Sequence, residues 1–200
     1  GQKPYGRTQM GRDVRWSNNN TLTWKQKIQK HNYDIMLGHE VSYRNSEHLL
    51  GEAMDFPFDN LGNNNLGLGA VPSKVESGYS EKMLLSFFAR ANYSYNNRYL
   101  LTATVRADGS TVFSQKNKWG FFPSASAAWV ISEEEFMKQL PMVDNLKFRI
   151  GYGLAGNQSG IDSYTTLNLV KPNGVVPVGN SAVVSLGDLR NTNPDLKWEV

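Results

Sequence analysis

Regular alternation of side-chain character is the feature that most constrains this chain. In the segment 98–107, "RYLLTATVRA", apolar side chains recur at every second position. The apolar set is Tyr99, Leu101, Ala103, Val105 and Ala107. The polar set is Thr102, Thr104 and Arg106, and Asp108, directly after the segment, continues it. A period of two predicts a β-strand whose two faces meet different surroundings. Those surroundings are either a protein core and water, or lipid and a wet lumen.

The same alternation recurs along the chain and predicts an all-β antiparallel meander of long strands. The expected strands cover 21–29, 33–43, 82–95, 98–107, 119–131 and 146–155. Tight turns are expected at Lys30–Asn32 and at Asn96–Asn97, because asparagine tolerates the left-handed conformation. Weaker strand patterns occur at 163–170 and 182–186, and a last strand is expected from Leu196.

Two segments between these strands have other expected structures. The segment 45–81 is rich in Gly, Asn, Pro and Asp without a strong period, which predicts a long loop. The segment 132–140, "SEEEFMKQL", predicts one short helix. Ser132 is its expected N-cap, and Glu135 stands at the capping-box spacing from it.

Composition narrows the class of protein. The 200 residues include 21 basic and 18 acidic side chains, for a net charge of +3, so nucleic-acid binding has little support. The absence of cysteine excludes disulfides and thiolate metal sites. Mean hydropathy is −0.48, and no run reaches the ~18 apolar residues of a membrane-spanning helix. Membrane β-strands remain compatible with this value because they alternate.

Connection lengths and aromatic positions favour a transmembrane barrel. Short and long connections alternate along the chain, as they do between the two sides of such barrels. Aromatic side chains gather at two levels, which is typical of lipid headgroup boundaries. One set is Tyr33, Tyr93, Tyr95, Tyr99 and Trp129, and the other is Trp119, Phe121 and Tyr152. An autonomous soluble β-sandwich that binds carbohydrate or a protein partner would also alternate, and it is the alternative at this point.

Both ends of the sequence look cut. The start, "GQKPYGRTQM", has no initiator Met and no apolar signal segment, and "NPDLKWEV" stops where a strand pattern begins. We therefore expect a piece excised from a larger protein.

Four linked stretches resemble one known family. "NYSYNNRYLLTATVRADGSTVF", "KWGFFPSASAAWVISEEEFM", "LKFRIGYGLAGNQ" and "NPDLKWE" are similar, in this order, to the barrel of SusC/RagA-type TonB-dependent outer-membrane transporters. The resemblance runs from about residue 20 to the C-terminus. It implies that residues 1–200 are a barrel segment without a plug domain or signal peptide.

The resemblance also implies a function and partners for the parent protein. Such transporters have a barrel of about 22 strands, filled by a plug domain of the same chain. They import oligosaccharides or peptides across the bacterial outer membrane with energy passed through TonB. A SusD-like surface lipoprotein forms their lid, and outer-membrane lipid surrounds the barrel.

Two groups of residues are the candidate sites. We expect one group to face the lumen and hold the barrel wall against the plug: Arg90, Arg106, Asp108 and Arg149. The other group belongs to "DFPFDNLGNNN" and is a candidate for contact with a glycan ligand: Phe56, Phe58, Asn63, Asn64 and Asn65. Loop packing explains the second group equally well, and the spacing does not match an EF-hand loop.

No motif supports catalysis, metal binding or a cofactor. "HEVSY" at 39–43 begins like a zinc-protease motif, but Tyr43 stands where the second histidine is needed. The glutamates of "SEEEFMK" are expected to be solvated at a helix start. "GNQSG" lacks the nucleophile-elbow spacing, and "GLGAVPSK" lacks the phosphate-loop spacing. We expect no enzyme.

Overall fold

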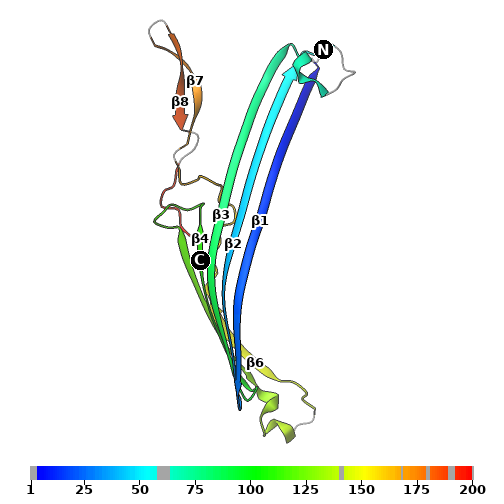
Figure 1. Cartoon of the computed structure of the whole chain (residues 1–200), viewed down its shortest axis with the longest axis vertical. Coiled ribbons are helices and arrows are strands. Elements are labelled where there is room, and N and C mark those ends of the chain that lie inside the picture. Colours follow the sequence, from blue (N-terminus) through cyan, green and yellow to red (C-terminus); the bar gives the residue numbers. More distant parts are fainter. Residues whose placement is uncertain are drawn as a thin grey trace. The chain divides into compact units, whose positions relative to one another are not determined.

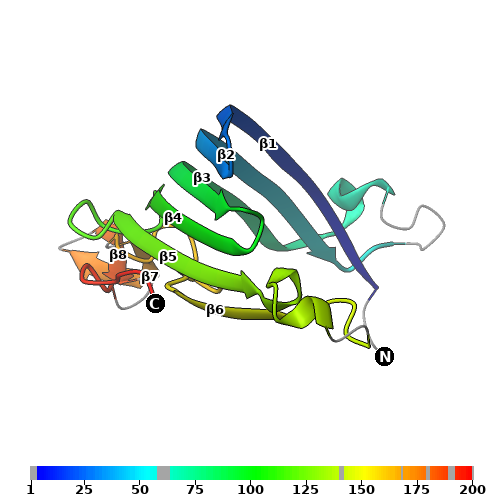
Figure 2. The same ribbon diagram turned by 90° about the horizontal axis from the view of Figure 1, so that it is seen from below.

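The computed structural model describes residues 4–57, 64–139, 142–167, 169–178, 181–188 and 192–199. Six strands lie side by side in sequence order in one sheet (Figures 1 and 2). They are β1 (Tyr5–Ile28), β2 (His31–Met54), β3 (Val71–Tyr95), β4 (Tyr99–Ser110), β5 (Trp119–Val130) and β6 (Lys147–Gly153). No helix in the described part of the chain is long and apolar enough to cross a lipid bilayer. The predicted all-β antiparallel meander is confirmed.

The chain divides into two compact units. Unit 1 contains Gly1–Trp16 and Ser42–Lys82, and unit 2 contains Ser17–Val41 and Met83–Val200. Strands β4, β5 and β6 belong to unit 2, and β1, β2 and β3 contribute residues to both units.

The turn between β3 and β4 fixes the register of unit 2. Asn96 and Asn97 both have positive φ, at 50° and 56°, which matches the predicted tight turn. From this turn the pairing runs without a shift from Tyr95 opposite Tyr99 to Leu84 opposite Ser110. The pairs of β4 with β5 and of β5 with β6 are also antiparallel and regular.

This register separates the side chains of unit 2 onto two faces. We call one the apolar face: it carries Phe87, Ala91, Tyr93, Tyr99, Leu101, Ala103, Val105, Phe121, Ala125, Trp129, Phe148, Ile150 and Tyr152. We call the other the polar face: it carries Ser86, Phe88, Arg90, Asn92, Thr102, Thr104, Arg106, Asp108, Ser124, Ser126, Ala128, Arg149, Gly151 and Gly153. Both sets follow the predicted alternation.

No second layer of the described residues covers the apolar face of β5 and β6. Phe121 is 67% exposed, Ile150 63% and Tyr152 78%. A soluble β-sandwich would bury such side chains between two sheets. The described residues therefore lack the second sheet that the sandwich alternative requires.

A cluster of packed aromatic rings in unit 2 lies around Trp198. The Trp198 ring packs 4.8 Å from the ring of Phe113 and 5.4 Å from that of Phe122, measured between centroids. The Trp198 indole Nε1 donates to the carbonyl of Lys118 at 3.2 Å. These contacts anchor the segment 192–199 through the Trp198 side chain. A strand from Leu196 was expected, but the segment forms only an isolated bridge from Glu199 to Asn157.

The prediction of a long loop over 45–81 is wrong for most of that segment. Strand β2 continues to Met54, strand β3 begins at Val71, and β1 begins at Tyr5 rather than near residue 21. A strand of 24 residues spans about 80 Å, whereas ~9–11 residues cross a membrane. In the parts of β1, β2 and β3 that were not predicted, which we call the extensions, both faces of the strand carry many polar side chains. The alternation of apolar and polar residues that identifies a strand in a sequence is therefore weak there.

Ion pairs join the strands of unit 1. Asp13 on β1 accepts hydrogen bonds from Arg15 at 2.8 Å and from Arg44 on β2 at 2.8 Å. These bonds hold the pKa of the Asp13 carboxyl far below its ordinary value, and the bond from Arg15 has the largest effect. Arg7 and Glu52 form a further pair at 3.6 Å. Cross-strand charge pairs thus link β1 and β2 within unit 1.

The predicted helix over 132–140 is also wrong. The connection between β5 and β6 contains two single 3-10 turns, Ile131–Glu133 and Met137–Gln139. The backbone N–H groups of Ile131 and Ser132 both donate to the carbonyl of Leu146, so Ser132 does not cap a helix. These bonds tie the start of the connection to the residue before β6 and prevent a regular α-helical turn.

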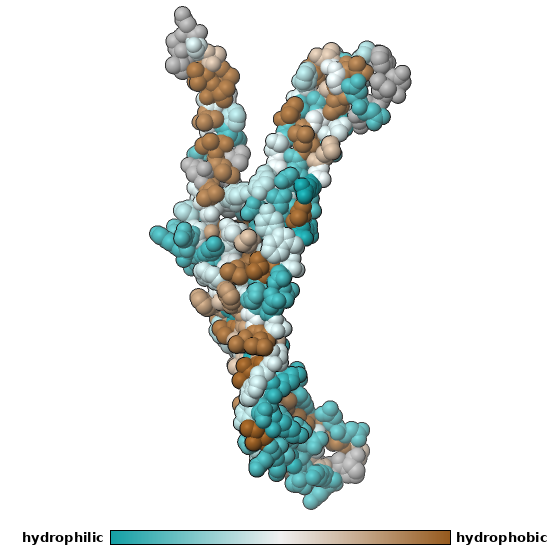
Figure 3. All heavy atoms as spheres, viewed as in Figure 1, coloured by the Kyte–Doolittle hydropathy of each residue, from teal (hydrophilic) through white to brown (hydrophobic). Residues whose placement is uncertain are grey.

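Glu134 anchors this connection to the end of the sheet. Its carboxylate accepts hydrogen bonds from the Tyr99 hydroxyl at 2.7 Å, from the Trp129 indole at 3.0 Å and from Arg98 at 3.0 Å. These donors lower the pKa of Glu134 below its ordinary value of 4.5, and the Tyr99 hydroxyl has the largest effect. Figure 3 shows the end of unit 2 that includes this connection as mostly hydrophilic.

The remaining strands form a separate two-stranded sheet. Strands β7 (Val170–Val178) and β8 (Ser181–Asp188) pair antiparallel, with a register shift between Pro172 and Val175. The weak pattern at 182–186 is confirmed as a strand, but residues 163–166, the start of the other weak pattern, form a turn. The first turn lies at Gln29 and Lys30, close to its predicted place.

Replacing Asn96 tests the left-handed turn. Asn96→Ala is expected to lower the free energy of unfolding by about 1 kcal/mol, because alanine lacks the short polar side chain whose local hydrogen bonding lets asparagine adopt a positive φ. Asn96→Gly is the control and is expected to be neutral or stabilising. Urea unfolding in detergent micelles measures both, and equal stability of the two variants would contradict the prediction.

Acidification tests the Glu134 anchor. Because its folded-state pKa is lowered, the stabilisation it contributes is fully present above pH 4.5 and is lost as pH falls through the lowered pKa. Melting temperatures measured from neutral to about pH 3 should fall less steeply for Glu134→Gln than for the wild type. Glu133→Gln is the matched control, and a profile for Glu134→Gln that overlays the wild type would refute the anchor.

Candidate functional site

A row of aromatic rings crosses the apolar face at its short-turn end. The ring centroids of Tyr33 and Tyr93 lie 5.3 Å apart, those of Tyr95 and Tyr99 6.4 Å apart, and Trp129 stacks on Tyr99 at 6.5 Å. His31 lies between the tyrosines and shares a hydrogen bond of 2.8 Å with the Tyr93 hydroxyl. All five predicted members of this set lie on one face, and we call them, with His31, the lower ring row.

A second row crosses the same face farther along the strands. Phe87 stacks on Trp119 at 6.3 Å and lies 6.3 Å from His39. Trp119 reaches Phe87 across β4 because Gly109 stands between them: a Cβ there would lie 3.0 Å from three of its ring atoms. We call this the upper ring row. Phe121 and Tyr152, which were predicted at this level, share the apolar face.

The spacing of the two rows corresponds to a bilayer. On β5, Trp119 and Trp129 are separated by ten residues, or about 33 Å along the strand. With the usual barrel tilt this becomes ~25 Å, the height of the apolar band of outer-membrane barrels.

The polar face contains a network centred on Arg106. Its guanidinium donates to Asp108 at 2.7 Å, to Glu40 of β2 at 3.2 Å and to the buried hydroxyl of Ser86 of β3 at 2.9 Å. The guanidinium carbon also lies 5.7 Å from the ring centroid of Phe88, which is a cation–π contact. One side chain thus joins three strands.

Arg90 and Arg149 share the polar face with this network but lie outside it. Arg90 stands opposite Thr104, and Arg149 stands opposite Ala128. Neither arginine makes an ion pair with a described residue. The structure therefore brings Arg106 and Asp108 together and leaves the other two predicted residues apart.

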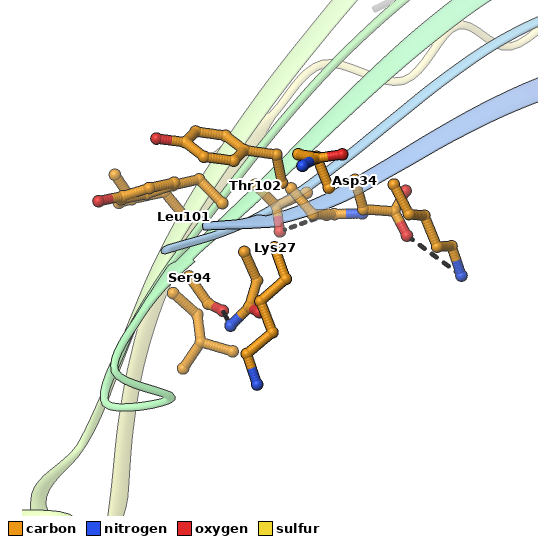
Figure 4. A pocket seen from close by; sticks show the side chains of 12 residues that line it. Lys27, Asp34, Ser94, Leu101 and Thr102 are labelled. Carbon is orange, nitrogen blue, oxygen red and sulfur yellow. Dashed lines mark hydrogen bonds and ion pairs between the residues drawn. The ribbon is translucent and has the colours of Figure 1, made fainter. Parts of the chain in front are cut away.

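A hollow of about 520 Å³ opens at the short-turn end of unit 2 (Figure 4). Its polar lining includes Lys27, Asp34, Ser94 and Thr102, and Tyr33, Tyr93 and Leu101 also border it. Across the hollow, Asn32 donates to Ser94 at 3.1 Å, and Thr102 donates to Asn92 at 2.9 Å. Lys25 pairs with Asp34 at 3.5 Å.

The predicted ligand-loop residues have structural roles where they are described. Asn65 accepts a hydrogen bond from the backbone of Gly67 and caps the 3-10 turn Leu66–Leu68. Phe56 is half-buried beside Gly6. Asn64 is exposed, and Phe58 and Asn63 lie outside the described residues. Contact of this group with a ligand stays a prediction.

Sequence analysis missed the partners of Arg106. The period of two gives the face of each residue on its strand, but the register across three strands that brings Glu40, Ser86 and Phe88 to Arg106 was not predicted. His39 contacts Asn20 at 3.3 Å and the ring of Phe87 at 6.3 Å between centroids. Within the described ranges, no cluster of three or more His, Asp or Glu side chains could hold a metal ion.

The sequence is similar to known receptors. The family model described as "TonB dependent receptor-like, beta-barrel" matches residues 2–200. A TonB-dependent receptor of Formosa agariphila is 39% identical over 192 residues, which cover 92% of this chain and 19% of that relative. The TonB-dependent receptor SusC of Bacteroides thetaiotaomicron is 42% identical over 119 residues, which cover 58% of this chain and 12% of SusC.

Solved structures of one transporter share the fold. The RagAB peptide transporter matches with a TM-score of 0.84 and 28% identity, over 96% of this chain and 21% of that chain. Its "open-open" state matches with a TM-score of 0.80. The chain spans about a fifth or less of the length of these relatives. It therefore belongs to the TonB dependent receptor-like β-barrel family of outer-membrane proteins.

Proposed function

We propose that this chain is a wall segment of a TonB-dependent receptor that imports nutrients across the bacterial outer membrane. One observation carries the proposal: the sheet has an exposed apolar face bounded by two aromatic ring rows. Lipid favours such a face, and its headgroup boundaries favour the rows. The relatives, about five times longer than this chain, support its being part of a larger receptor.

The two faces then have separate roles. The apolar face contacts lipid, and the polar face lines the lumen. The lower ring row and the short turns lie on the periplasmic side, because short turns in these barrels are periplasmic. The long strands β1, β2 and β3 continue beyond the upper ring row on the outer side.

The parent receptor has further parts and partners in this proposal. A plug domain of the same chain fills the lumen, TonB supplies energy, and a SusD-like lipoprotein covers the opening. The cargo is an oligosaccharide or a peptide, and the peptide transporter among the structural relatives supports the second. The role of the receptor requires no catalysis.

The candidate residues have structural roles in this function. Arg106 and Asp108 stabilise the wall from the lumen side by joining β2, β3 and β4. Arg90 and Arg149 face the plug. Phe56, Phe58, Asn63, Asn64 and Asn65 are proposed to lie on the outer side, where cargo first meets the receptor.

Adjacent substitutions on opposite faces test the lipid assignment. Ala103→Lys places a charge in the apolar band and is expected to destabilise the receptor by about 2–4 kcal/mol. Thr104→Lys places the same charge on the polar face. Thr104 stands opposite Arg90, but the repulsion between these two charges should destabilise the receptor by only a few tenths of a kcal/mol. Folding yield in phospholipid vesicles compares the two variants, and a larger loss for Thr104→Lys would invert the assignment of faces.

Uptake by cells tests the importer function. A strain that lacks the parent receptor is expected to lose growth on its cargo and to regain it when the gene is restored. Growth on peptide mixtures and on oligosaccharide mixtures is measured separately, which identifies the class of cargo. Unchanged growth on every mixture would contradict import by this receptor.

A further inference from the structure

The connection between β5 and β6 is much longer than the other connections at the same end of the sheet (Figure 1). Residues 29–30 join β1 to β2 and residues 96–98 join β3 to β4, whereas residues 131–146 join β5 to β6. Connections on the periplasmic side of outer-membrane barrels are short. A connection of this length that contains no long element of its own usually has a function. We call residues 131–146 the β5–β6 connection.

Glu134 holds this connection on the apolar side of the sheet. Its carboxylate accepts hydrogen bonds from the Tyr99 hydroxyl at 2.7 Å and from the Trp129 indole at 3.0 Å. Tyr99 and Trp129 stand opposite each other in the register, and both rings belong to the apolar face. A carboxylate that meets both ring tips lies on the same side of the sheet as the rings. The start of the connection therefore bends toward the outside of the wall and not under the lumen.

The same bonds place the start of the connection at the level of the lipid headgroups. Tyrosine and tryptophan at a membrane boundary turn their polar tips toward headgroups and water. In this structure Glu134 takes the place of those partners for Tyr99 and Trp129. The residues that follow Glu134 in the chain therefore begin at the boundary itself, next to the lower ring row.

Bulky apolar side chains of the connection are exposed. Phe136, two residues after Glu134, is 57% exposed, and Met142 is 95% exposed. Val143 and Leu146 are exposed as well, and Leu146 has the same parity along the chain as Phe148 of the apolar face. Transfer of such side chains from water into an apolar medium is favourable. The apolar medium nearest to a segment beside the lower ring row is the lipid that the apolar face contacts.

The charges that anchor the connection are balanced within it. Arg98 donates to Glu134 at 3.0 Å and to Glu135 at 3.3 Å, and Lys138 donates to Glu135 at 2.8 Å. Two cations thus accompany two carboxylates, so this part of the connection has no excess positive charge that would select anionic lipid. Binding through the apolar side chains should therefore occur with phospholipids that carry no net charge.

We propose that the β5–β6 connection is an interfacial lipid-binding segment, whose Phe136 and Met142 side chains enter the periplasmic leaflet beside the lower ring row. The inference rests on the orientation given by the function proposed above and adds a lipid contact that lies outside the strands. Amphipathic segments that lie in the plane of a membrane place their apolar side chains at the boundary between headgroups and acyl chains. Glu134 is the positioning residue, because its bonds to the two rings fix where the segment starts.

Spin labels on the parent receptor in lipid vesicles test where these side chains lie. The chain contains no cysteine, so Phe136→Cys and Met142→Cys each introduce one labelling site, with any cysteine elsewhere in the receptor replaced by serine. The vesicles contain phosphatidylcholine and phosphatidylethanolamine, which carry no net charge. Oxygen concentrates among the acyl chains, whereas a nickel chelate stays in water. Both labels are expected to collide more often with oxygen than with the nickel chelate.

A label on the same connection provides the matched control. Glu133 is exposed and precedes the anchor, so Glu133→Cys should collide more often with the nickel chelate than with oxygen. The proposal is overturned if the labels at positions 136 and 142 also collide mainly with the nickel chelate. It is equally overturned if both labels are shielded from both reagents, because that result would assign the connection to a protein partner.

Removing the anchor tests the positioning role of Glu134. Glu134→Ala removes the acceptor shared by Tyr99 and Trp129, so the label at position 136 should shift from oxygen toward the nickel chelate. Glu133→Ala is the control and should leave the preference of that label unchanged. Gels confirm that the barrel is folded in each variant. An unchanged preference in Glu134→Ala would refute the positioning role.

Failure of this inference can be separated from failure of the proposed function. The uptake assay reports import wherever the β5–β6 connection lies, and the comparison of Ala103→Lys with Thr104→Lys reports which face meets lipid. If both give their expected results while the labels report water, only the lipid-binding segment is refuted. If the labels report lipid while uptake is unaffected by deletion of the receptor, the segment stands without the import role.

Discussion

The register between β3 and β4 is the constraint on which the rest of unit 2 depends. Side chains alternate between faces, so a slip of one residue would exchange the faces completely. The left-handed Asn96 and Asn97 set this register, and the contact of Arg106 with Glu40 and Ser86 depends on it. The same turn therefore determines both the continuity of the ring rows and the burial of Ser86. Because one face is apolar and the other polar, every alternative register would place side chains of the wrong kind on each face.

The sequence predicts those parts of the fold in which the two faces of a strand differ. Strand β4 could be placed to within a few residues because Tyr99 to Ala107 alternate against threonine and arginine. The extensions of β2 and β3 could not, because near Glu47 and Lys74 both faces are polar and the period carries no signal. The expected helix failed for a different reason. Its sequence has the local capping pattern of a helix. The backbone conformation is instead determined by hydrogen bonds to the Leu146 carbonyl and by the bond from the Tyr99 hydroxyl to Glu134.

For the candidate site, composition and period identify the face of each residue but not its partners. Arg90, Arg106 and Arg149 are indistinguishable as inward-facing arginines in the sequence. Only the register shows that Arg106 meets two carboxylates while the others meet threonine and alanine. This distinction separates an arginine whose counter-charges lie within the sheet from two arginines that make no ion pair with a described residue. It is a property of three strands together, so no single segment could reveal it.

The great length of β1, β2 and β3 means that strand ends cannot mark the edges of the membrane. Strand β2 continues from His39 of the upper ring row to Met54, and β3 begins at Val71, well before Phe87, so only the rings record where the apolar band stops. Vertical position in the bilayer is thus set by a few side chains and is independent of how far the backbone extends. Insertions or deletions at the outer ends of these strands would change the height of the rim above the surface. They would leave the immersion depth of the barrel unaltered.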